Sequence, residues 1–348
     1  MSSKLATLLE QLNKQGVTTE LYGDAQFPIM VYARDPQLTS DPEKAAQWVD
    51  QQKPLISDLL LEAGAVIFRG FAVPDSPDFE RFLGAFKTVD FDYTGGGTDR
   101  GAPEGKVFQS TRARNDWRLV LHQEMAYMPR YPKRIAFYCR VAPDVGGETI
   151  ISPMRGFTDK VRPGFMEKLR ETGVLNIRNF RDEKRSAGHE KLDANHRTWQ
   201  EAFLTQDPKE VEQKINDLGL EFEWQENGSV TMTYRGPAVI NHPVTGEELW
   251  FNQINTQAPT DQSWGADRAA LMRSELYNAK NPPPYDVRYG NGDPFEWEDV
   301  LTLNPIYDSA CVGVPYEKGD VMLLDNFLVA HGRNPYEGQR DVKVMLFD

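Results

Sequence analysis

The chain has 348 residues and is acidic, with 39 lysines and arginines against 52 aspartates and glutamates and a formal net charge of −13. This balance argues against nucleic acid or an anionic membrane as a main partner. Only two cysteines are present, Cys139 and Cys311, which excludes a disulfide framework and a cysteine-rich zinc site. We find no apolar stretch suited to a signal sequence or a membrane span, and we therefore expect a cytoplasmic protein.

The N-terminal part alternates helix and strand patterns. Residues 1–60 are expected to form a helical segment that packs on the rest of the protein, with helices over 4–15 and Trp48–Leu61. A short buried strand at Ala65–Phe68 precedes a helix over Asp75–Phe86, for which Asp75 or Ser76 is a suitable N-cap. We expect one domain over the whole chain, because no linker, low-complexity tract or internal repeat divides it.

Strand patterns dominate from Leu119 onward. Helices predicted at about 158–171, 208–217 and 266–278 interrupt the strands rather than alternate with them. Aromatic and aliphatic residues predict strands at Arg134–Val141, Ile150–Ile151, Asp320–Leu324 and Asp341–Phe347. The first of these alternates as a half-buried strand does. This order favours a mostly β fold with flanking helices, a double-stranded β-helix (jelly roll), over a doubly wound α/β sheet. Residues of about 155–280 are expected to form a helical and loop insertion that serves as a lid.

His122 and Glu124 are spaced for metal binding. On an extended strand, side chains two residues apart lie on one face, so both could ligate one ion. His331, far downstream, would complete a two-histidine, one-carboxylate site with open coordination positions, which is typical of non-haem Fe(II) oxygenases. The alternative is that both histidines are ordinary polar residues. Of the three other histidines, His189 and His196 are expected to be solvated, and His242 precedes a proline in a turn.

A candidate anchor for a second carboxylate follows the second histidine in the sequence. Arg340 is placed to clamp a carboxylate with two parallel hydrogen bonds, and the Thr149 hydroxyl could add a third. A keto acid that chelates iron at one end and meets an arginine and a threonine at the other is 2-oxoglutarate. Arg333 is the rival anchor, because it also lies near His331.

Several longer motifs surround these residues and resemble the taurine dioxygenase superfamily of Fe(II)/2-oxoglutarate oxygenases. The similarity is greatest to its clavaminate synthase-like and syringomycin-pathway hydroxylase-like branch, and it extends from about residue 60 to the C-terminus. The motifs are His122-Gln-Glu124-Met-Ala-Tyr127, Pro132, Phe137-Tyr-Cys139, Pro143-x-x-Gly146-Gly-Glu-Thr149, His242-Pro-Val-Thr-Gly-Glu247, Trp250-Phe-Asn-Gln253, Gly319 to Asn326, and His331-Gly-Arg333-x-Pro335-Tyr336-x-Gly338-x-Arg340.

The resemblance implies roles for individual residues. His122, Glu124 and His331 would bind iron, with Arg340 and Thr149 on 2-oxoglutarate and O2 as the other co-substrate. Family members often have aspartate at the acidic position, where this chain has Glu124. Because related halogenases place a small residue there, Glu124 makes halogenation an unexpected reaction.

We expect a small substrate that is amino-acid-like or peptide-like, either free or tethered to a carrier, and hydroxylation of an aliphatic carbon in specialised metabolism. Epoxidation or desaturation is the alternative within the family. Outside it, we consider a zinc hydrolase and a non-catalytic jelly-roll binding protein, and the chain is compatible with a homo-oligomer.

Candidate substrate contacts are Arg112, Arg114 and Asn252. The loop at Gly95–Gly101 and the charged segment Asn179–Trp199 are candidate lids. A local basic patch at Arg178–Arg185 would be needed for docking to an acidic carrier protein.

Overall fold

The computed structural model describes residues 2–91, 104–111, 113–184, 196–278 and 281–348, and all statements below concern these residues. Its largest sheet has seven strands in the order β1-β2-β3-β16-β6-β19-β4. These strands are β1 Val17–Leu21, β2 Ile29–Ala33, β3 Ala65–Arg69, β16 Val321–Asp325, β6 Arg134–Val141, β19 Asp341–Phe347 and β4 Phe108–Gln109. All neighbours are antiparallel except β2 and β3.

A second sheet has four strands in the order β15-β8-β17-β5. They are β15 Val312–Gly313, β8 Ile150–Pro153, β17 Val329–Arg333 and β5 Leu119–His122. Two short pairs accompany the larger sheets: β18 Tyr336–Glu337 with β7 Val145–Gly146, and β12 Val239–Asn241 with β13 Glu248–Trp250.

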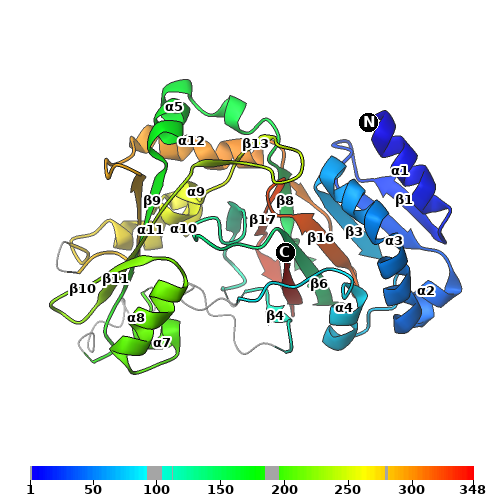
Figure 1. The fold of residues 1–348 in the computed structure, drawn as a ribbon, viewed down its shortest axis with the longest axis horizontal. Coiled ribbons are helices and arrows are strands. Elements are labelled where there is room, and N and C mark those ends of the chain that lie inside the picture. Colours follow the sequence, from blue (N-terminus) through cyan, green and yellow to red (C-terminus); the bar gives the residue numbers. More distant parts are fainter. Residues whose placement is uncertain (1, 92–103, 112, 185–195, 279–280) are drawn as a thin grey trace.

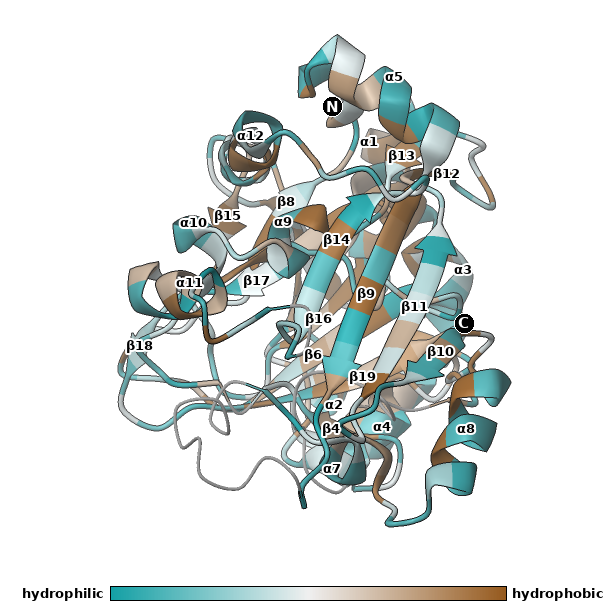
Figure 2. Cartoon of the chain, turned by 90° about the vertical axis from the view of Figure 1, so that its left-hand side faces the viewer, coloured by the Kyte–Doolittle hydropathy of each residue, from teal (hydrophilic) through white to brown (hydrophobic). Residues whose placement is uncertain are grey.

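A third sheet, in the order β10-β11-β9-β14, lies within and after the segment expected as an insertion. Its strands are β10 Glu221–Trp224, β11 Val230–Gly236, β9 Val174–Phe180 and β14 Tyr285–Tyr289. Figure 2 shows these strands facing the viewer, with hydrophilic and hydrophobic residues interspersed along them. The segment expected as a helical and loop insertion over residues 155–280 thus also contains strands, β9 to β13.

The helices lie outside the sheets (Figure 1). Helix α3 illustrates the sequence signals: Asp41 caps its first turn by accepting from the backbone N–H groups of Glu43 and Lys44, and Gly64 ends it in the left-handed conformation with φ +80°. The helices are α1 Ser3–Asn13, α2 Pro36–Ser40, α3 Pro42–Ala63, α4 Ser76–Phe82, α5 Pro163–Thr172, α7 Trp199–Phe203, α8 Pro208–Asp217, α9 Ile254–Gln257, α10 Asp261–Trp264, α11 Ala266–Met272 and α12 Trp297–Asp308, with a 3-10 turn at Thr158–Lys160.

The N-terminal segment is not purely helical, in contrast to the expectation for residues 1–60. It contributes β1 and β2, which extend the seven-stranded sheet beyond β3. The predicted N-cap Asp75 does begin α4, since its carboxylate accepts from the backbone N–H of Asp78. Within the described residues, no helix is both long and apolar enough to cross a membrane.

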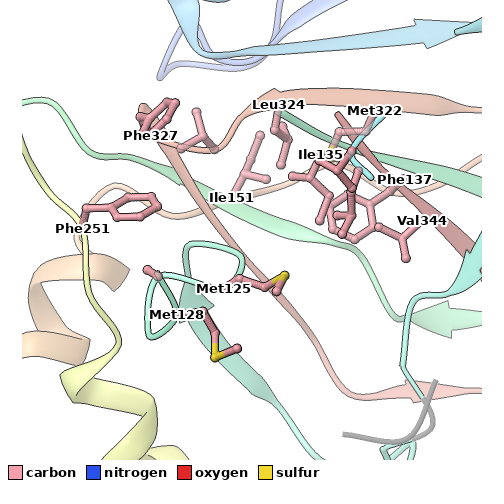
Figure 3. Close-up of a cluster of buried hydrophobic side chains, with 14 of the residues drawn as sticks. Met125, Met128, Ile135, Phe137, Ile151, Phe251, Met322, Leu324, Phe327 and Val344 are labelled. Atoms are coloured by element: carbon pink, nitrogen blue, oxygen red, sulfur yellow. The ribbon is translucent and has the colours of Figure 1, made fainter. Parts of the chain in front are cut away.

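Strand β6 shows how the two main cores are divided. Ile135 and Phe137 pack in one buried cluster, whereas the alternating residues Ala136 and Tyr138 pack in another cluster with residues of α1, α3 and α4. Both faces of the strand are thus buried, which explains its continuous apolar sequence. Figure 3 shows part of the first cluster, in which Ile135 and Phe137 lie near Ile151, Met322, Leu324 and Val344.

Candidate metal centre and its cavity

His122 and His331 lie opposite each other on adjacent antiparallel strands. They are register partners in β5 and β17, and their ring centroids are 4.5 Å apart. The chains approach closely here because Gly332 has no side chain: a Cβ on it would lie 2.4 Å from the carbonyl oxygen of Leu119. Strand pairing therefore brings together two histidines that are far apart in the sequence.

Glu124 reaches the same place from a turn. Strand β5 ends at His122, so the prediction that one strand carries both ligand candidates is wrong: Glu124 lies in the turn that follows, where Met125 has φ +57°. Asn326 holds this turn: its Oδ1 accepts from the Glu124 backbone N–H at 2.7 Å, and its Nδ2 donates to the carbonyls of Glu124 at 3.0 Å and Pro132 at 2.9 Å. Gln123, between the two candidates, points away and donates to the carbonyls of Trp250 and Phe327.

These three side chains could hold a metal ion. One donor atom from each of His122, Glu124 and His331 lies within 4.8 Å of the others. Nε2 of His331 is 3.3 Å from a Glu124 carboxylate oxygen, close to the separation of about 3 Å between adjacent ligands of an octahedral ion with bonds of about 2.1 Å. Nδ1 of His122 lies 2.9 Å from the Val120 carbonyl, and this contact favours the tautomer with the proton on Nδ1 and the lone pair on Nε2, the form that ligates a metal through Nε2. The donor set thus fits a two-histidine, one-carboxylate centre.

Arg340 and Thr149 lie together beside this centre. Nη2 of Arg340 is 3.4 Å from the Thr149 hydroxyl, Nη1 is 3.5 Å from the Ser110 hydroxyl, and Nε donates to the Gly147 carbonyl at 2.8 Å. The Tyr316 hydroxyl, which the sequence did not single out, donates to Thr149 at 2.7 Å. Burial lowers the pKa of Arg340, but this group is protonated at any physiological pH.

Arg333 is engaged differently. Its guanidinium donates to the backbone carbonyls of Ala113 at 3.1 Å and Trp117 at 2.7 Å, and also to that of Arg114. Burial, together with the nearby charge of Arg340, lowers its pKa to about 10. These contacts fix the segment before β5 and commit most donors of Arg333 to the backbone.

One cavity of about 350 Å³ is lined both by the three metal candidates and by Arg340 with Thr149. Its volume is near the lower end of the range of about 300–1,000 Å³ for ligand sites. Besides the metal candidates and the Arg340 group, its walls include Tyr127, Arg178, His196, Gln253, Gln257, Trp264, Arg268 and Tyr285. Many of these come from residues 155–280, so that segment forms much of the wall.

Several residues that were expected in solvent or in a turn are buried in the structure. His196 is not solvated: it is 2% exposed, lines the cavity, and its Nε2 lies 2.6 Å from the Asn179 carbonyl. His242 is also buried, 3.2 Å from Asp325. Arg178 and Arg181 are buried at 3% and 5% exposure, so these two residues do not contribute to a basic surface patch at Arg178–Arg185.

Of the three substrate-contact candidates, the two that the structure describes, Asn252 and Arg114, do not line the cavity. Asn252 is buried, and its side chain binds the Ala238 carbonyl and the Ile254 N–H. Arg114 pairs at the surface with Asp116 at 2.7 Å. Arg112, His189 and the loop at 95–101 lie outside the described residues. Of the charged candidate lid, only the parts before 185 and after 195 are described.

The fold and this centre define a class of enzyme, the non-haem dioxygenases that use Fe(II), 2-oxoglutarate and O2. The chain belongs to the TauD, TfdA family: the family model described as taurine catabolism dioxygenase TauD, TfdA family matches residues 31–346. It is accordingly an Fe(II)/2-oxoglutarate-dependent dioxygenase, which confirms the resemblance seen in the sequence.

Two relatives and one solved structure show the range of this similarity. The chain is 32% identical over 304 residues to a clavaminate synthase-like protein of Arabidopsis thaliana, covering 86% of each chain. It is 29% identical over 293 residues to the dapdiamide synthesis protein DdaC of Enterobacter agglomerans, covering 84% of each. The crystal structure of AAD-2 in complex with Mn(II) and N-oxalylglycine shares the fold, with a TM-score of 0.50 and 12% identity over 95% of this chain and 96% of that one.

Proposed function

We propose that this dioxygenase hydroxylates an aliphatic carbon of a small amino-acid-like or peptide-like molecule, with His122, Glu124 and His331 as the iron ligands. The observation that carries the proposal is the convergence of these three donors within 4.8 Å on the wall of a cavity that also contains Arg340 and Thr149. The relative described as a dapdiamide synthesis protein supports a role in specialised metabolism.

The surrounding residues would set the net charge of the metal site and the orientation of its ligands. Two neutral imidazoles and one carboxylate leave a site that binds Fe(II) with a net charge of +1, suited to an anionic chelating co-substrate. Asn326 fixes the backbone on both sides of Glu124, and the Val120 carbonyl orients His122. When bound, Fe(II) and 2-oxoglutarate supply oxidising chemistry in which O2 converts 2-oxoglutarate to succinate and carbon dioxide and a substrate C–H bond is oxidised.

Arg340 and Thr149 are proposed to hold the carboxylate of 2-oxoglutarate that does not bind iron. Nε of Arg340 is occupied by the Gly147 carbonyl, so Nη1 and Nη2 remain for a carboxylate, beside the hydroxyls of Ser110 and Thr149. We propose Arg340 rather than Arg333 for this role, because the Arg333 donors bind backbone carbonyls.

We further propose that the seven-stranded and four-stranded sheets form a double-stranded β-helix in a single domain, with residues 155–280 as its lid. Supporting this, the apolar cluster of Figure 3 combines Ile135 and Met322 of one sheet with Ile151 of the other. The lid assignment rests on Arg178, His196 and Trp264, which all line the cavity. Slower amide hydrogen exchange across 155–280 on binding of co-substrate and substrate would support it.

The test of the proposed function is anaerobic titration of metal-free protein with Fe(II) and then 2-oxoglutarate. We expect a visible metal-to-ligand charge-transfer band that is lost in His331→Ala and kept in His196→Gln, a histidine change in the same cavity. Absence of the band with Fe(II) fully bound would overturn the proposal and favour a zinc hydrolase or a binding protein. Mass analysis of the product distinguishes hydroxylation, which adds one oxygen atom, from desaturation, which removes two hydrogens.

A further inference from the structure

Arg178 brings a buried positive charge to the cavity wall. It lies in β9, is 3% exposed and lines the cavity. Its Nε and Nη1 are buried and have no hydrogen-bond partner among the described residues, and no described carboxylate forms an ion pair with it. Because an unpaired buried charge is strongly unfavourable, such a group is expected to be neutralised by a ligand.

Aromatic rings hold this guanidinium without neutralising it. Its Cζ is 4.7 Å from the ring centroid of Tyr127 and 5.5 Å from those of Phe180 and Tyr285. Tyr285 is its register partner in β14, and Tyr127 belongs to the turn that carries Glu124. Cation–π contacts orient a guanidinium but accept no hydrogen bond from its N–H groups in the plane. The charge is therefore fixed in position on the wall of the cavity that the three metal candidates also line, and its Nε and Nη1 have no hydrogen-bond partner among the described residues.

The cavity as a whole is positive in a protein of net charge −13. Its described walls contain a single carboxylate, that of Glu124, and five arginines: Arg178, Arg197, Arg268, Arg333 and Arg340. Under the proposed function, Glu124 binds iron and Arg340 binds 2-oxoglutarate, and Arg333 is engaged with the backbone. Of the other three, Arg197 donates to the Glu201 carbonyl and Arg268 lies over the rings of Trp117 and Trp264. Arg178 is the one whose Nε and Nη1 are both buried without a hydrogen-bond partner, and it is therefore placed to meet a second anion.

We propose that Arg178 binds a free carboxylate of the substrate, which makes the substrate a small free acid, such as an amino acid or short peptide, rather than a carrier-tethered one. This inference rests on the proposed function and deepens it. A planar guanidinium matches a carboxylate through two parallel, charge-assisted hydrogen bonds. A carboxyl group tied up as a carrier thioester is neutral and would leave the charge of Arg178 unpaired.

The experiment uses the Fe(II)-loaded enzyme with saturating 2-oxoglutarate. The probes are L-amino acids and glycyl dipeptides, each supplied as the free acid and as the carboxamide, and succinate release is measured. We expect turnover only with free acids, and for each active acid a kcat/KM about 100-fold above that of its amide. Equal turnover of an acid and its amide would overturn the proposal, and so would a panel in which no free acid stimulates succinate release.

Two variants test Arg178 itself. In Arg178→Met, we expect kcat/KM for the active acid to fall about 100-fold and the preference for acid over amide to disappear. Arg178→Lys keeps the charge but not the planar fork, and should retain part of the preference. Arg235→Gln, an exposed arginine on the neighbouring strand β11, is the matched control and should change neither value.

Thermal unfolding separates ligand binding from a structural role. Without substrate, Arg178→Met should melt at the same temperature as the wild type or higher, because it removes an unpaired buried charge. A much lower melting temperature would show an intramolecular partner and overturn the proposal. Absence of the charge-transfer band in the wild type would instead contradict the proposed function. Failure of the Arg178 proposal and failure of the proposed function are therefore distinguishable.

Discussion

The Tyr316 hydroxyl donates a 2.7 Å hydrogen bond to Thr149, whose own hydroxyl lies 3.4 Å from Nη2 of Arg340. Because Thr149 Oγ1 accepts from Tyr316, its proton is free to be donated elsewhere. In the proposed complex it points to the 2-oxoglutarate carboxylate. Under the proposed function, Tyr316 would thus be a positioning residue for the co-substrate, although it lies far from Thr149 in the sequence.

Tyr316→Phe removes this hydrogen bond while it keeps the ring. We expect the KM for 2-oxoglutarate to rise about fivefold with little change in kcat, in line with the value of one hydrogen bond, about 1 kcal/mol. Steady-state succinate release measures both constants. Tyr138→Phe, which loses a 3.0 Å bond to the Val73 carbonyl away from the cavity, should leave the KM unchanged. An unchanged KM in Tyr316→Phe would contradict the prediction.

Asn326 positions Glu124 through three hydrogen bonds and is fully buried. Asn326→Ala removes three buried hydrogen bonds, so we expect the free energy of unfolding to fall by about 3 kcal/mol. Fe(II) affinity should fall about 10-fold or more, as is usual when groups that orient metal ligands are lost. Denaturant unfolding and anaerobic Fe(II) titration measure the two effects. Asn241→Ala, at an exposed asparagine of β12, controls for the truncation and should affect neither.

The residues of the candidate metal centre were largely predictable, because they belong to short motifs that are contiguous in the sequence. The spacing of His122 and Glu124, and the motif around His331, are readable in one sequence, although the turn at Glu124 was not. The strand Arg134–Val141 was also predicted with the bounds found in β6, from its aromatic and aliphatic residues. Its burial was not predicted, because the pattern indicated a half-buried strand, whereas residues 135–139 are buried on both faces.

The rest of the cavity depends on tertiary contacts that have no local signal. Arg178 lies just before a charged run, and Arg181 is inside it; such a run is usually on the surface. The burial of Arg178 depends on packing against Tyr127 and Tyr285, which come from other parts of the chain. His196 is also buried by tertiary packing. Its ring contacts the backbone carbonyl of Asn179, and no sequence motif indicates such a contact.

His196 gives stability a pH dependence. Burial lowers its pKa to about 4 from an ordinary value of 6.5, so the unfolded chain takes up a proton at a higher pH than the folded one. The contribution of His196 to stability is therefore complete above about pH 6.5 and is lost as the pH falls towards about 4. The loss is about 1.4 kcal/mol per pH unit within this window.

His196→Gln keeps a donor for the Asn179 carbonyl and removes the titration. The difference in unfolding free energy between wild type and variant, measured with the metal-free proteins, should be constant above about pH 7 and should slope between about pH 6.5 and about pH 5. Parallel curves over the whole range would show that His196 does not titrate in this way.

Gly147 is needed where the chain passes Arg340. It has φ +72°, and a Cβ on it would lie 2.7 Å from Pro143 Cγ, 2.9 Å from Tyr336 Cβ and 3.2 Å from Arg340 Cδ. Gly147→Ala therefore combines a strained backbone with a displacement of the Arg340 side chain. We expect the melting temperature to fall and the KM for 2-oxoglutarate to rise about 10-fold or more, since the proposed anchor Arg340 moves while the proposed metal ligands do not.

Gly246→Ala separates the two contributions. Gly246 has a similar φ of +74°, but nothing lies within 4 Å of its added Cβ, so this variant carries the backbone strain alone. It should lose about 1 kcal/mol of stability and keep the wild-type KM for 2-oxoglutarate. If both variants lose stability equally and both keep that KM, crowding at Gly147 does not position Arg340. A KM that rises only in Gly147→Ala, with an intact charge-transfer band at saturating 2-oxoglutarate, would place the effect on the co-substrate anchor.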